Sequence, residues 1–519
     1  MVAAAHPLAA RAGADILAQG GNAFDAAVAV AACLNVVEPF MSSLAGMGFA
    51  TVWVAAEQRV RVLDFVPPVP ASFPVERFEA REQLVRGPLS IGLPGNLKGW
   101  ATLSASYGRL PLARVLAPAA AIAEAGFPLL PFGAYEFSLN AEQLEPYPDL
   151  APAWTENYIP AGVPKTGDTL RQLALAATLR ALGEQGPGLF YEGALGERLV
   201  AQVQALGGTL TMADLGCVTA IWREPATVEY RGLAVHCPPP PCEGFQFLLA
   251  LRILDGFSFA GMAPNSPEHL DLVLRAIRLA AGVRLARNNP TPADLADILA
   301  EPHVAALRHT LRSGQPIDRP TEQWTPPEPG PDLGHTTSFS VADAEGNLVC
   351  ITQSLGGTFG SYVVVPGTGI CLNNFLYWAD VRPGSPNRVT PGAPLPMCMA
   401  PTISLQSGRP MLVLGTPGSY GILQTQVQAM VQHIDFAQPL QDAVAAPRAR
   451  LWDGTRVQIE NRIPPATIAA LRHRGHDITA FDTGYTMVVG GMHAIHIDPA
   501  TGTMTGAADP RRDGRAVGV

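Results

Sequence analysis

The sequence predicts an α+β fold in which helices cover layered sheets, and three observations lead to this class. The chain has 519 residues, of which 48% are hydrophobic and 15% charged, enough to bury one large core or two ordinary ones. Helical patterns dominate before Thr321, whereas strand patterns dominate after it. No internal repeat is visible, and strand patterns occur in both parts. We therefore expect strands from both parts to share sheets.

The elements of the first part alternate between helix and strand. The segment "PLAARAGADILAQ" is an amphipathic helix stopped by Gly20 and Gly21, and residues Phe24 to Val37 form a buried helix. The next stretch, "MGFATVWVAAEQRVRVLDF", has the period of two that strands show. Four helical patterns closed by glycine follow: "GNLKGWATLSASYG", "LARVLAPAAAIAEAG", "LRQLALAATLRALGEQG" and "LGERLVAQVQALGG". A strand, a polyproline break and two more helices complete this part.

The second part begins after a composition shift at "TEQWTPPEPGPDLGH", Thr321 to His335. Short strand patterns follow, in "TTSFSVAD", "LVCITQS", "SYVVVPG", "GICLNNF", "TISLQ" and "MLVLGTPG". Two helices are expected next, in "QTQVQAMVQHID" and "PATIAALRHRG". The last pair of strands is expected around "MVVGGMHAIHID".

Charge and cysteine usage exclude several classes of function. The net charge is −9, the pI is about 5.7 and no run of Lys or Arg occurs, so neither nucleic acid nor a membrane is expected as a partner. Seven cysteines are scattered and mostly lie in apolar context, which is typical of reduced core residues. No "CxxC" motif occurs and the 11 histidines show no paired spacing. We therefore expect no metal site.

The N-terminal segment bears on the location of the protein. "MVAAAHPLAARAGADIL" reaches His6 and Arg11 before any apolar run of signal-peptide length. No uncharged apolar run reaches the roughly 18 residues that a membrane span requires. The sequence predicts a cytoplasmic protein. A periplasmic location stays open if the start is misassigned and a leader has been lost.

A hairpin is expected from Ser338 to Ser354, with its loop at Ala344, Glu345 and Gly346. If Asp343 and Asn347 close this loop, counting back along both strands places Ser354 directly opposite Thr336. The Cβ atoms of such a pair lie roughly 4.5 to 5.5 Å apart, so the two hydroxyl groups can share a hydrogen bond. The alternative interpretation is that two threonines, which are good strand residues, stand together by chance.

The polar, proline-rich stretch before Thr336 favours a catalytic interpretation. A threonine hydroxyl is a poor nucleophile without a base, and a threonine at the start of a chain supplies that base as its own α-amino group. The pKa of this amine, about 7.7 to 8, suits general-base catalysis at neutral pH. Such a terminus requires cleavage of the bond between His335 and Thr336.

Several blocks of the chain resemble the gamma-glutamyltransferase family of N-terminal-nucleophile hydrolases, over almost the whole length. They are "ADILAQGGNAFDAAVAV", "GLPGNLKGWATLSASYGRLPL", "YRGLAVHCPPPPCEGF", "HTTSFSVADAEGN", "GTGICLNN" and "APTI" through "GTPG". The resemblance implies a four-layer αββα sandwich that cleaves itself into a large subunit, 1–335, and a small subunit, 336–519, which stay associated as one intertwined domain. Thr336 is then both the cleaving residue and the nucleophile, Thr337 supports its amine, and Ser354 matches the family's second hydroxyl residue. The implied partner is a small-molecule amide, and no cofactor is needed.

The segment "GTPGS" is the candidate oxyanion site. The backbone N–H groups of Gly418 and Ser419 suit a developing alkoxide, because glycine allows close approach. The family usually carries two glycines here, and Ser419 keeps the N–H while losing backbone freedom. The alternative interpretation is an ordinary turn.

The donor pocket departs from the members of the family that accept glutathione. These bind the γ-glutamyl ammonium with a carboxylate in an "NNQ" segment and the α-carboxylate with an arginine and a serine pair. The corresponding positions here are apolar or small: Gly356, Phe375, Trp378, Met397 and Cys398. The expected arginine aligns near Ser72, and Arg77 is close in sequence. Holding both charges without partners costs several kcal/mol.

These departures predict an acyl group that is apolar or aromatic, or that lacks a free α-amino group. Repacking with anchors from elsewhere, such as Asp380 or Arg388, is the alternative. The main functional hypothesis is a self-processing amidohydrolase or acyltransferase whose donor specificity is shifted away from glutathione. A cephalosporin-acylase-like hydrolase, a non-catalytic binding protein of the same family and an unrelated two-domain binding protein stay open. The identities of the acyl donor and acceptor also stay open, as does the choice between hydrolysis and acyl transfer. A dimer of heterodimers is possible as well.

Overall fold

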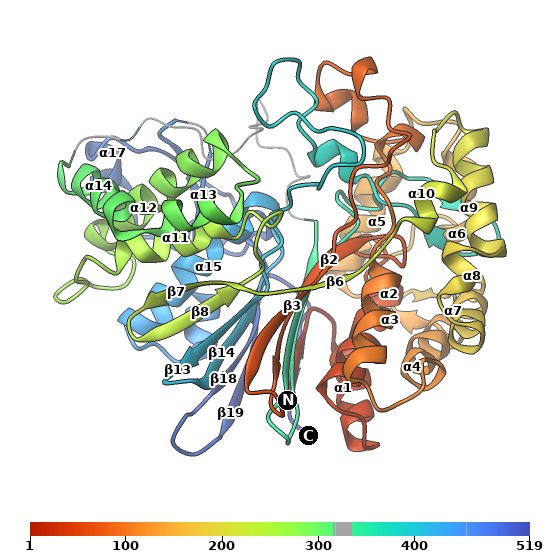
Figure 1. Cartoon of the computed structure of the whole chain (residues 1–519), viewed down its shortest axis with the longest axis horizontal. Coiled ribbons are helices and arrows are strands. Elements are labelled where there is room, and N and C mark those ends of the chain that lie inside the picture. The colour runs from red at the N-terminus through yellow and green to blue at the C-terminus, as the bar shows by residue number, and fades with distance from the viewer. Residues whose placement is uncertain (315–316, 318–334, 453) are drawn as a thin grey trace.

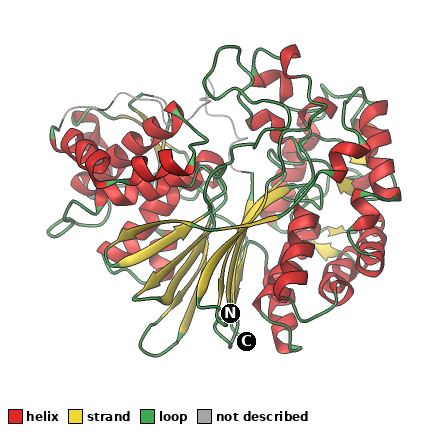
Figure 2. Cartoon of the chain, viewed as in Figure 1, coloured by secondary structure: helices red, strands yellow, loops and turns green. Residues whose placement is uncertain are grey.

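The computed structural model describes residues 1–314, 317, 335–452 and 454–519. Most of the predicted loop from Thr321 to His335 lies outside these residues. Two sheets stack face to face in the middle of the molecule, and helices cover the outer face of each (Figures 1 and 2). The predicted four-layer αββα arrangement is confirmed.

The larger sheet contains strands from both parts of the chain. Its order is β20 (Arg515–Val517), β1 (Val2–Ala4), β9 (Thr337–Ala342), β10 (Leu348–Ser354), β2 (Met47–Val54), β3 (Arg59–Phe65) and β6 (Ile221–Arg223). The smaller sheet has the order β19 (Met504–Ala508), β18 (His493–Ile497), β14 (Arg409–Gly415), β13 (Thr402–Gln406), β8 (Leu233–Cys237) and β7 (Ala226–Tyr230). Because β1 lies between β20 and β9, an N-terminal strand is enclosed by strands from after Thr336.

Helices of the first part cover the larger sheet, on the right in Figure 1. They are α1 (Pro7–Ala18), α2 (Ala23–Val37), α3 (Asn96–Tyr107), α4 (Leu112–Ala125), α5 (Pro131–Gln143), α6 (Ala151–Tyr158), α7 (Leu173–Gln185), α8 (Gly188–Tyr191), α9 (Ala194–Ala205) and α10 (Met212–Gly216). All residues of α2 are buried, as its apolar sequence predicts. Asn22 caps this helix and accepts the N–H groups of Phe24 and Asp25.

The smaller sheet packs against a second group of helices. They are α11 (Phe245–Leu254), α12 (Pro267–Ala286), α13 (Pro292–Leu299), α14 (Glu301–Arg312), α15 (Ile422–Met430), α16 (Leu440–Ala445) and α17 (Pro465–His473). Three small sheets complete the fold: β4 (Phe127–Pro128) with β5 (Thr169–Leu170), β11 (Val364–Val365) with β12 (Ile370–Cys371), and β15 (Ala449–Leu451) with β16 (Arg456–Ile459) and β17 (Asp477–Ala480).

The hydrophobic core has three parts that match the layers. A cluster that includes Ala3, Trp53, Cys350 and Val413 lies between the two sheets, and two larger clusters lie between each sheet and its helices. All seven cysteines are free, and only Cys217 is exposed. The sequence prediction of unpaired core cysteines therefore fails for one residue alone.

One strand prediction was wrong. The segment Met487 to Val489 forms a short 3-10 helix instead of a strand, and the last strand pair is β18 with β19. Gly490 follows with φ = 93°, a left-handed conformation that ends the helical turn. The turn lies beside the candidate oxyanion loop, because a Cβ atom on Gly418 would come within 3.2 Å of the Gly490 Cα.

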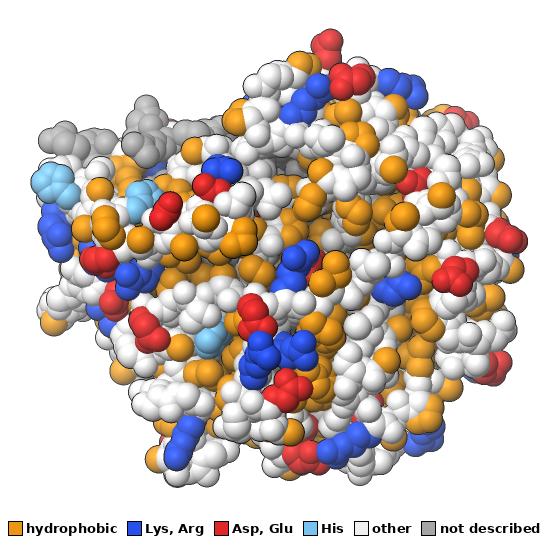
Figure 3. Space-filling view, in the orientation of Figure 1, with side chains coloured by type: hydrophobic (Ala, Val, Ile, Leu, Met, Phe, Trp, Pro, Cys, Tyr) orange, Lys and Arg blue, Asp and Glu red, His pale blue; other side chains and the backbone are white. Residues whose placement is uncertain are grey.

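On the face in Figure 3, basic and acidic side chains are interspersed. Among the described residues, every helix is too short or too polar to cross a membrane.

Two buried histidines make the fold sensitive to acid. The Nδ1 atoms of His6 and His269 accept the N–H groups of Leu8 and Asn265 at 3.2 and 2.9 Å. Burial lowers the pKa of each ring from 6.5 to about 4, so the unfolded chain takes up protons that the folded chain does not. The stabilisation is complete above pH 6.5 and is lost as the pH falls toward 4, at about 1.4 kcal/mol per pH unit for each ring.

We therefore expect the melting temperature to fall steeply between pH 6.5 and 4, which a pH series of thermal unfolding measures. The variant His269→Asn keeps an acceptor for the Asn265 N–H and cannot titrate. The melting temperature of this variant should fall less steeply between pH 6.5 and 4 than that of the wild type. Parallel profiles for the two proteins would contradict the assignment of this effect to His269.

Candidate active site

Thr336 immediately precedes β9, and its hydroxyl lies against the peptide bond before it. The pairing of Gln353 with Thr337 makes Ser354 and Thr336 the next pair, and their hydroxyl oxygens are 3.2 Å apart. Ser354 Oγ donates to the His335 carbonyl oxygen at 2.7 Å, and Thr336 Oγ1 also contacts that oxygen. The predicted hairpin register is confirmed.

The hairpin loop explains why this register could be predicted. The Asp343 N–H donates to the Asn347 carbonyl at 3.1 Å, so these two residues close the loop as expected. Gly346 has φ = 86°, which only glycine adopts without strain. The Asp343 carboxylate also accepts the Asn347 N–H and side-chain amide.

Two charged side chains from opposite ends of the chain hold the nucleophile segment. Thr337 Oγ1 donates to Glu38 Oε2 at 2.8 Å, and Arg512 donates to Glu38 Oε1 at 3.1 Å. Arg512 also donates to the Thr336 carbonyl oxygen at 2.9 Å. Burial raises the pKa of the Glu38 carboxyl group, against the opposing effects of Arg512 and Thr337. Sequence analysis missed both residues, although a glutamate directly after an apolar helix was a usable signal.

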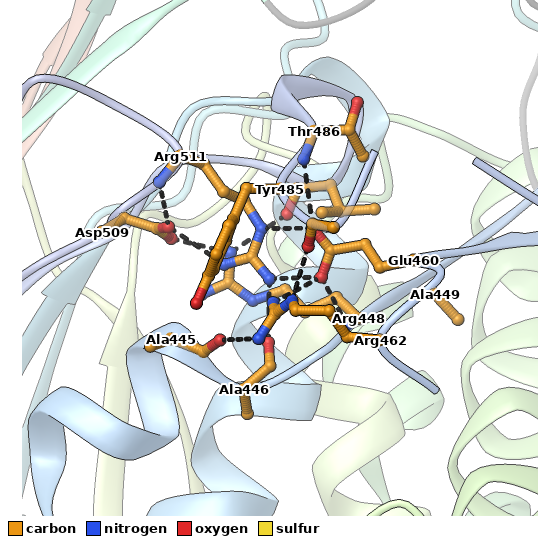
Figure 4. Close-up of polar contacts among 12 residues, drawn as sticks. Ala445, Ala446, Arg448, Ala449, Glu460, Arg462, Tyr485, Thr486, Asp509 and Arg511 are labelled. Carbon is orange, nitrogen blue, oxygen red and sulfur yellow. Dashed lines mark hydrogen bonds and ion pairs between the residues drawn. The ribbon is translucent and has the colours of Figure 1, made fainter. Parts of the chain in front are cut away.

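A largely buried ion-pair network (Figure 4) is linked to the backbone of Arg512 by a hydrogen bond. Its members are Arg448, Glu460, Arg462, Asp509 and Arg511. Asp509 accepts from Arg448 at 2.8 Å and from Arg511 at 2.9 Å, and its carbonyl accepts the Arg512 N–H at 3.1 Å. Burial lowers the pKa of Arg448 to about 10. Because its charges are paired and, apart from the partly exposed Arg462, buried, the network fixes the backbone that carries Arg512.

The candidate oxyanion loop follows β14 at the same end of the sheets. A Cβ atom on Gly415 would lie 2.1 Å from Ser338 Oγ, so the end of β14 lies against the start of β9. Gly418 has φ = 130° and Ser419 has φ = 54°. Ser419 therefore adopts a left-handed conformation that costs a side chain roughly 1 kcal/mol. The Gly418 carbonyl accepts from Arg450 at 2.8 Å, which fixes the loop.

Gly356 and Trp378, two of the predicted pocket residues, come together beside Ser354. The Gly356 N–H donates to Ser354 Oγ at 2.9 Å. A Cβ atom on Gly356 would lie 3.3 Å from Trp378 Nε1. The Trp378 ring meets the Tyr420 ring edge to face, with centroids 6.1 Å apart, and Tyr420 follows Ser419. The Trp378 indole thus lies between Gly356, which follows the hairpin that ends at Ser354, and Tyr420, which follows the candidate oxyanion loop.

The remaining pocket residues are more deeply buried. Met397 exchanges backbone hydrogen bonds with Pro241 and Glu243, which fixes the wall that carries it. Cys398 is buried and lies close enough to Tyr420 and Arg284 to influence them electrostatically. Phe375 belongs to the core that contains the smaller sheet, and packs against Gly92.

Charged groups also surround this pocket. The buried Arg81 guanidinium lies 4.4 Å from the Tyr377 ring centroid and 5.7 Å from that of Trp378. Arg284 lies over the Tyr420 ring at 4.3 Å and pairs with Glu243 at 2.8 Å, with both side chains fully buried. Sequence analysis placed the expected arginine near Ser72, with Arg77 close in sequence but not at the matching place, and did not consider Arg81, which lies a few residues further along the same stretch.

The alternative anchors considered from sequence make ion pairs of their own. Asp380 pairs with Arg382 at 2.9 Å, and Arg388 pairs with Glu76 at 3.1 Å. Within the described part of the chain, no group of three or more potential ligands is placed to hold a metal ion.

Comparisons with known proteins agree with this geometry. The family model for gamma-glutamyltranspeptidase matches residues 9–519. The "Acylase ACY 1 proenzyme" of Pseudomonas sp. (strain SE83) is 36% identical, with 100% of this chain and 93% of that protein covered. The "Glutathione hydrolase proenzyme" of Bacillus subtilis (strain 168) is 31% identical, with 100% and 91% covered.

Among solved structures, cephalosporin acylase from Bacillus halodurans superimposes with a TM-score of 0.91 at 32% identity, over 99% of this chain and 94% of that one. The similarity therefore covers both layers of sheet and both layers of helix. The chain belongs to the gamma-glutamyltranspeptidase family and is an enzyme of the N-terminal-nucleophile hydrolase type.

Proposed function

We propose that this protein is a self-cleaving amide hydrolase or acyltransferase in which Thr336 is the nucleophile. The observation that carries the proposal is the position of Thr336 Oγ1, which contacts both the His335 carbonyl oxygen and Ser354 Oγ. The hydroxyl group is already beside the bond whose cleavage would release the Thr336 amine.

The groups that self-cleavage needs already lie beside the bond between His335 and Thr336. Thr336 Oγ1 attacks the His335 carbonyl carbon, the carbon–nitrogen bond breaks, and the released amine takes up a proton. Ser354 donates to the carbonyl oxygen at 2.7 Å and so stabilises the negative charge that develops on it. Water hydrolyses the resulting ester, leaving a carboxylate on His335 and a free amine on Thr336. The products are the subunits 1–335 and 336–519.

The same hydroxyl then acts on an external amide. The free Thr336 amine accepts the hydroxyl proton, and the oxygen attacks the substrate carbonyl. The N–H groups of Gly418 and Ser419 stabilise the oxyanion. The amine product leaves with a proton, and water or a second amine releases the acyl group. Arg512 and Glu38 keep Thr336 and Thr337 in position throughout.

The acyl group is one that carries a carboxylate or an arene and lacks an ammonium. Trp378 and Tyr420, whose rings meet edge to face, and the buried Met397 are the apolar and aromatic residues of the proposed acyl site. Of the charges described around it, Glu243 pairs with Arg284 at 2.8 Å, and the Arg81 guanidinium lies beside Trp378 and 3.8 Å from the Glu82 carboxylate. A cation attracts a carboxylate and repels an ammonium. The similarity to an acylase and to a cephalosporin acylase supports this assignment.

A panel of anilides tests this specificity. Glutaryl and γ-glutamyl anilides differ by one ammonium group, and we expect at least about 100-fold lower kcat/KM for the γ-glutamyl compound, equivalent to roughly 3 kcal/mol. The variant Arg81→Met should slow hydrolysis of the glutaryl anilide more than that of an aryl-acyl anilide, which serves as the matched control. Equal kcat/KM values for the glutaryl and γ-glutamyl anilides would contradict the assignment.

A further inference from the structure

Arg450 lies directly against the candidate oxyanion loop. Its buried side chain extends from β15, and its Nη1 atom donates to the Gly418 carbonyl oxygen at 2.8 Å. The same oxygen accepts the Gly421 N–H at 2.9 Å, which closes the turn. A Cβ atom on Gly421 would lie 1.7 Å from the Arg450 Nη1 atom. The guanidinium group therefore occupies the space that a side chain at position 421 would need.

Two further contacts hold the guanidinium group at this turn. The Arg450 Nη1 atom lies 3.5 Å from the Val488 carbonyl oxygen, and the guanidinium carbon lies 4.9 Å from the centroid of the Trp452 ring. Because an arginine keeps its charge in proteins, the bond to the Gly418 carbonyl is a charge-assisted hydrogen bond. Such bonds are roughly twice as strong as those between neutral groups.

The Gly418 carbonyl and the Ser419 N–H belong to one peptide group. A peptide group is planar and trans, so its C=O and N–H bonds point in opposite directions. The Ser419 N–H therefore points away from the guanidinium group of Arg450. Amide resonance moves electron density from nitrogen to oxygen, and a cation at the oxygen increases this shift, because hydrogen bonds in a chain polarise one another. The Ser419 N–H becomes a stronger donor as a result.

From this arrangement we infer that Arg450 polarises the peptide group between Gly418 and Ser419 and so strengthens the oxyanion site. Arg450 acts through the loop and is a positioning residue. The inference rests on the proposed function, which assigns the Ser419 N–H to the oxyanion of the substrate. In self-cleavage the donor to the reacting carbonyl is Ser354, so variants of Arg450 should still mature and can be assayed as cleaved enzymes.

The experiment compares Arg450→Gln, which removes the charge, with Arg450→Lys, which keeps it. The matched control is Arg180→Gln, because the Arg180 side chain is 45% exposed and pairs with Glu124 at the surface. With a glutaryl p-nitroanilide, we expect Arg450→Gln to lower kcat by about tenfold with KM within about twofold of the wild type, a smaller loss than the roughly 100- to 1000-fold that follows removal of a whole oxyanion donor. Arg450→Lys should lose clearly less, and Arg180→Gln should leave both constants unchanged.

A transition-state analogue separates this effect from a general structural one. The compound 4-boronobutanoic acid carries the glutaryl chain and forms a tetrahedral adduct with the Thr336 hydroxyl, whereas glutarate binds as the planar product. Arg450→Gln should weaken inhibition by the boronate about tenfold and inhibition by glutarate less than about twofold. The ratio of these two constants does not depend on how much of the variant is folded. Equal weakening of both inhibitors, or equal losses in Arg450→Gln and Arg450→Lys, would overturn this inference and leave the proposed function intact. A wild-type chain that stays uncut and is not inhibited by the boronate would overturn both.

Discussion

The variant Thr336→Ala is expected to remain a single uncut chain without amidase activity. Intact mass under denaturing conditions should show two fragments for the wild type, one ending at His335 and one beginning at Thr336, and one full-length mass for the variant. Loss of a nucleophile lowers turnover by about 10⁴-fold or more. The effect is this large because the same hydroxyl performs both the cleavage and the later acyl transfer.

The matched control is Thr336→Ser, which keeps the hydroxyl and loses only a methyl group. This variant should still cleave itself, more slowly, and should retain measurable activity. Fragments from Thr336→Ala that match those of the wild type would show that another group cuts the chain. A wild-type chain that stays whole during incubation would favour the interpretation that the family fold here serves binding alone.

The second large effect is expected from Arg512→Met. Arg512 and Glu38 are both buried, and their contacts reach Thr336 and Thr337. Removing the guanidinium leaves a buried carboxylate without its cation, which costs about 3 to 5 kcal/mol. It also removes the donor to the Thr336 carbonyl oxygen. We expect a lower melting temperature, measured in the uncut Thr336→Ala background, and slow self-cleavage in the wild-type background.

The double variant Arg512→Met with Glu38→Gln separates stability from positioning. Neutralising Glu38 removes the unpaired charge, so most of the lost melting temperature should return. Self-cleavage should stay slow, because the Thr336 carbonyl still lacks its donor. Recovery of both properties together would show that Arg512 acts only through stability.

Local patterns in the sequence predicted the part of the site that local structure determines. Asp343, Gly346 and Asn347 specify one hairpin loop, and the loop alone places Ser354 beside Thr336. The glycine-rich "GTPG" segment likewise contains its own conformational signal. The strand expected at Met487 failed because Thr486 caps a short 3-10 helix there and Gly490, with φ = 93°, ends it.

The rest of the site depends on contacts that no local pattern contains. Glu38 and Arg512 are separated by 474 positions and meet only because the first and last strands share a sheet. Arg81 reaches Trp378 from a stretch whose alignment could not be fixed. Phe375 is buried in the same cluster as Met397 and Tyr420, and its place at the acyl site stays a prediction.

The interleaving of strands in the larger sheet has a consequence for how the mature enzyme is made. Cleavage before Thr336, as proposed above, would leave β1 of one fragment enclosed by β20 and β9 of the other. Separating the fragments then means dismantling the sheet, so dissociation and denaturation become one event. Renaturation, in turn, becomes a bimolecular process that depends on concentration. The cut thus converts a chain that folds by itself into an assembly that is built once and is long-lived.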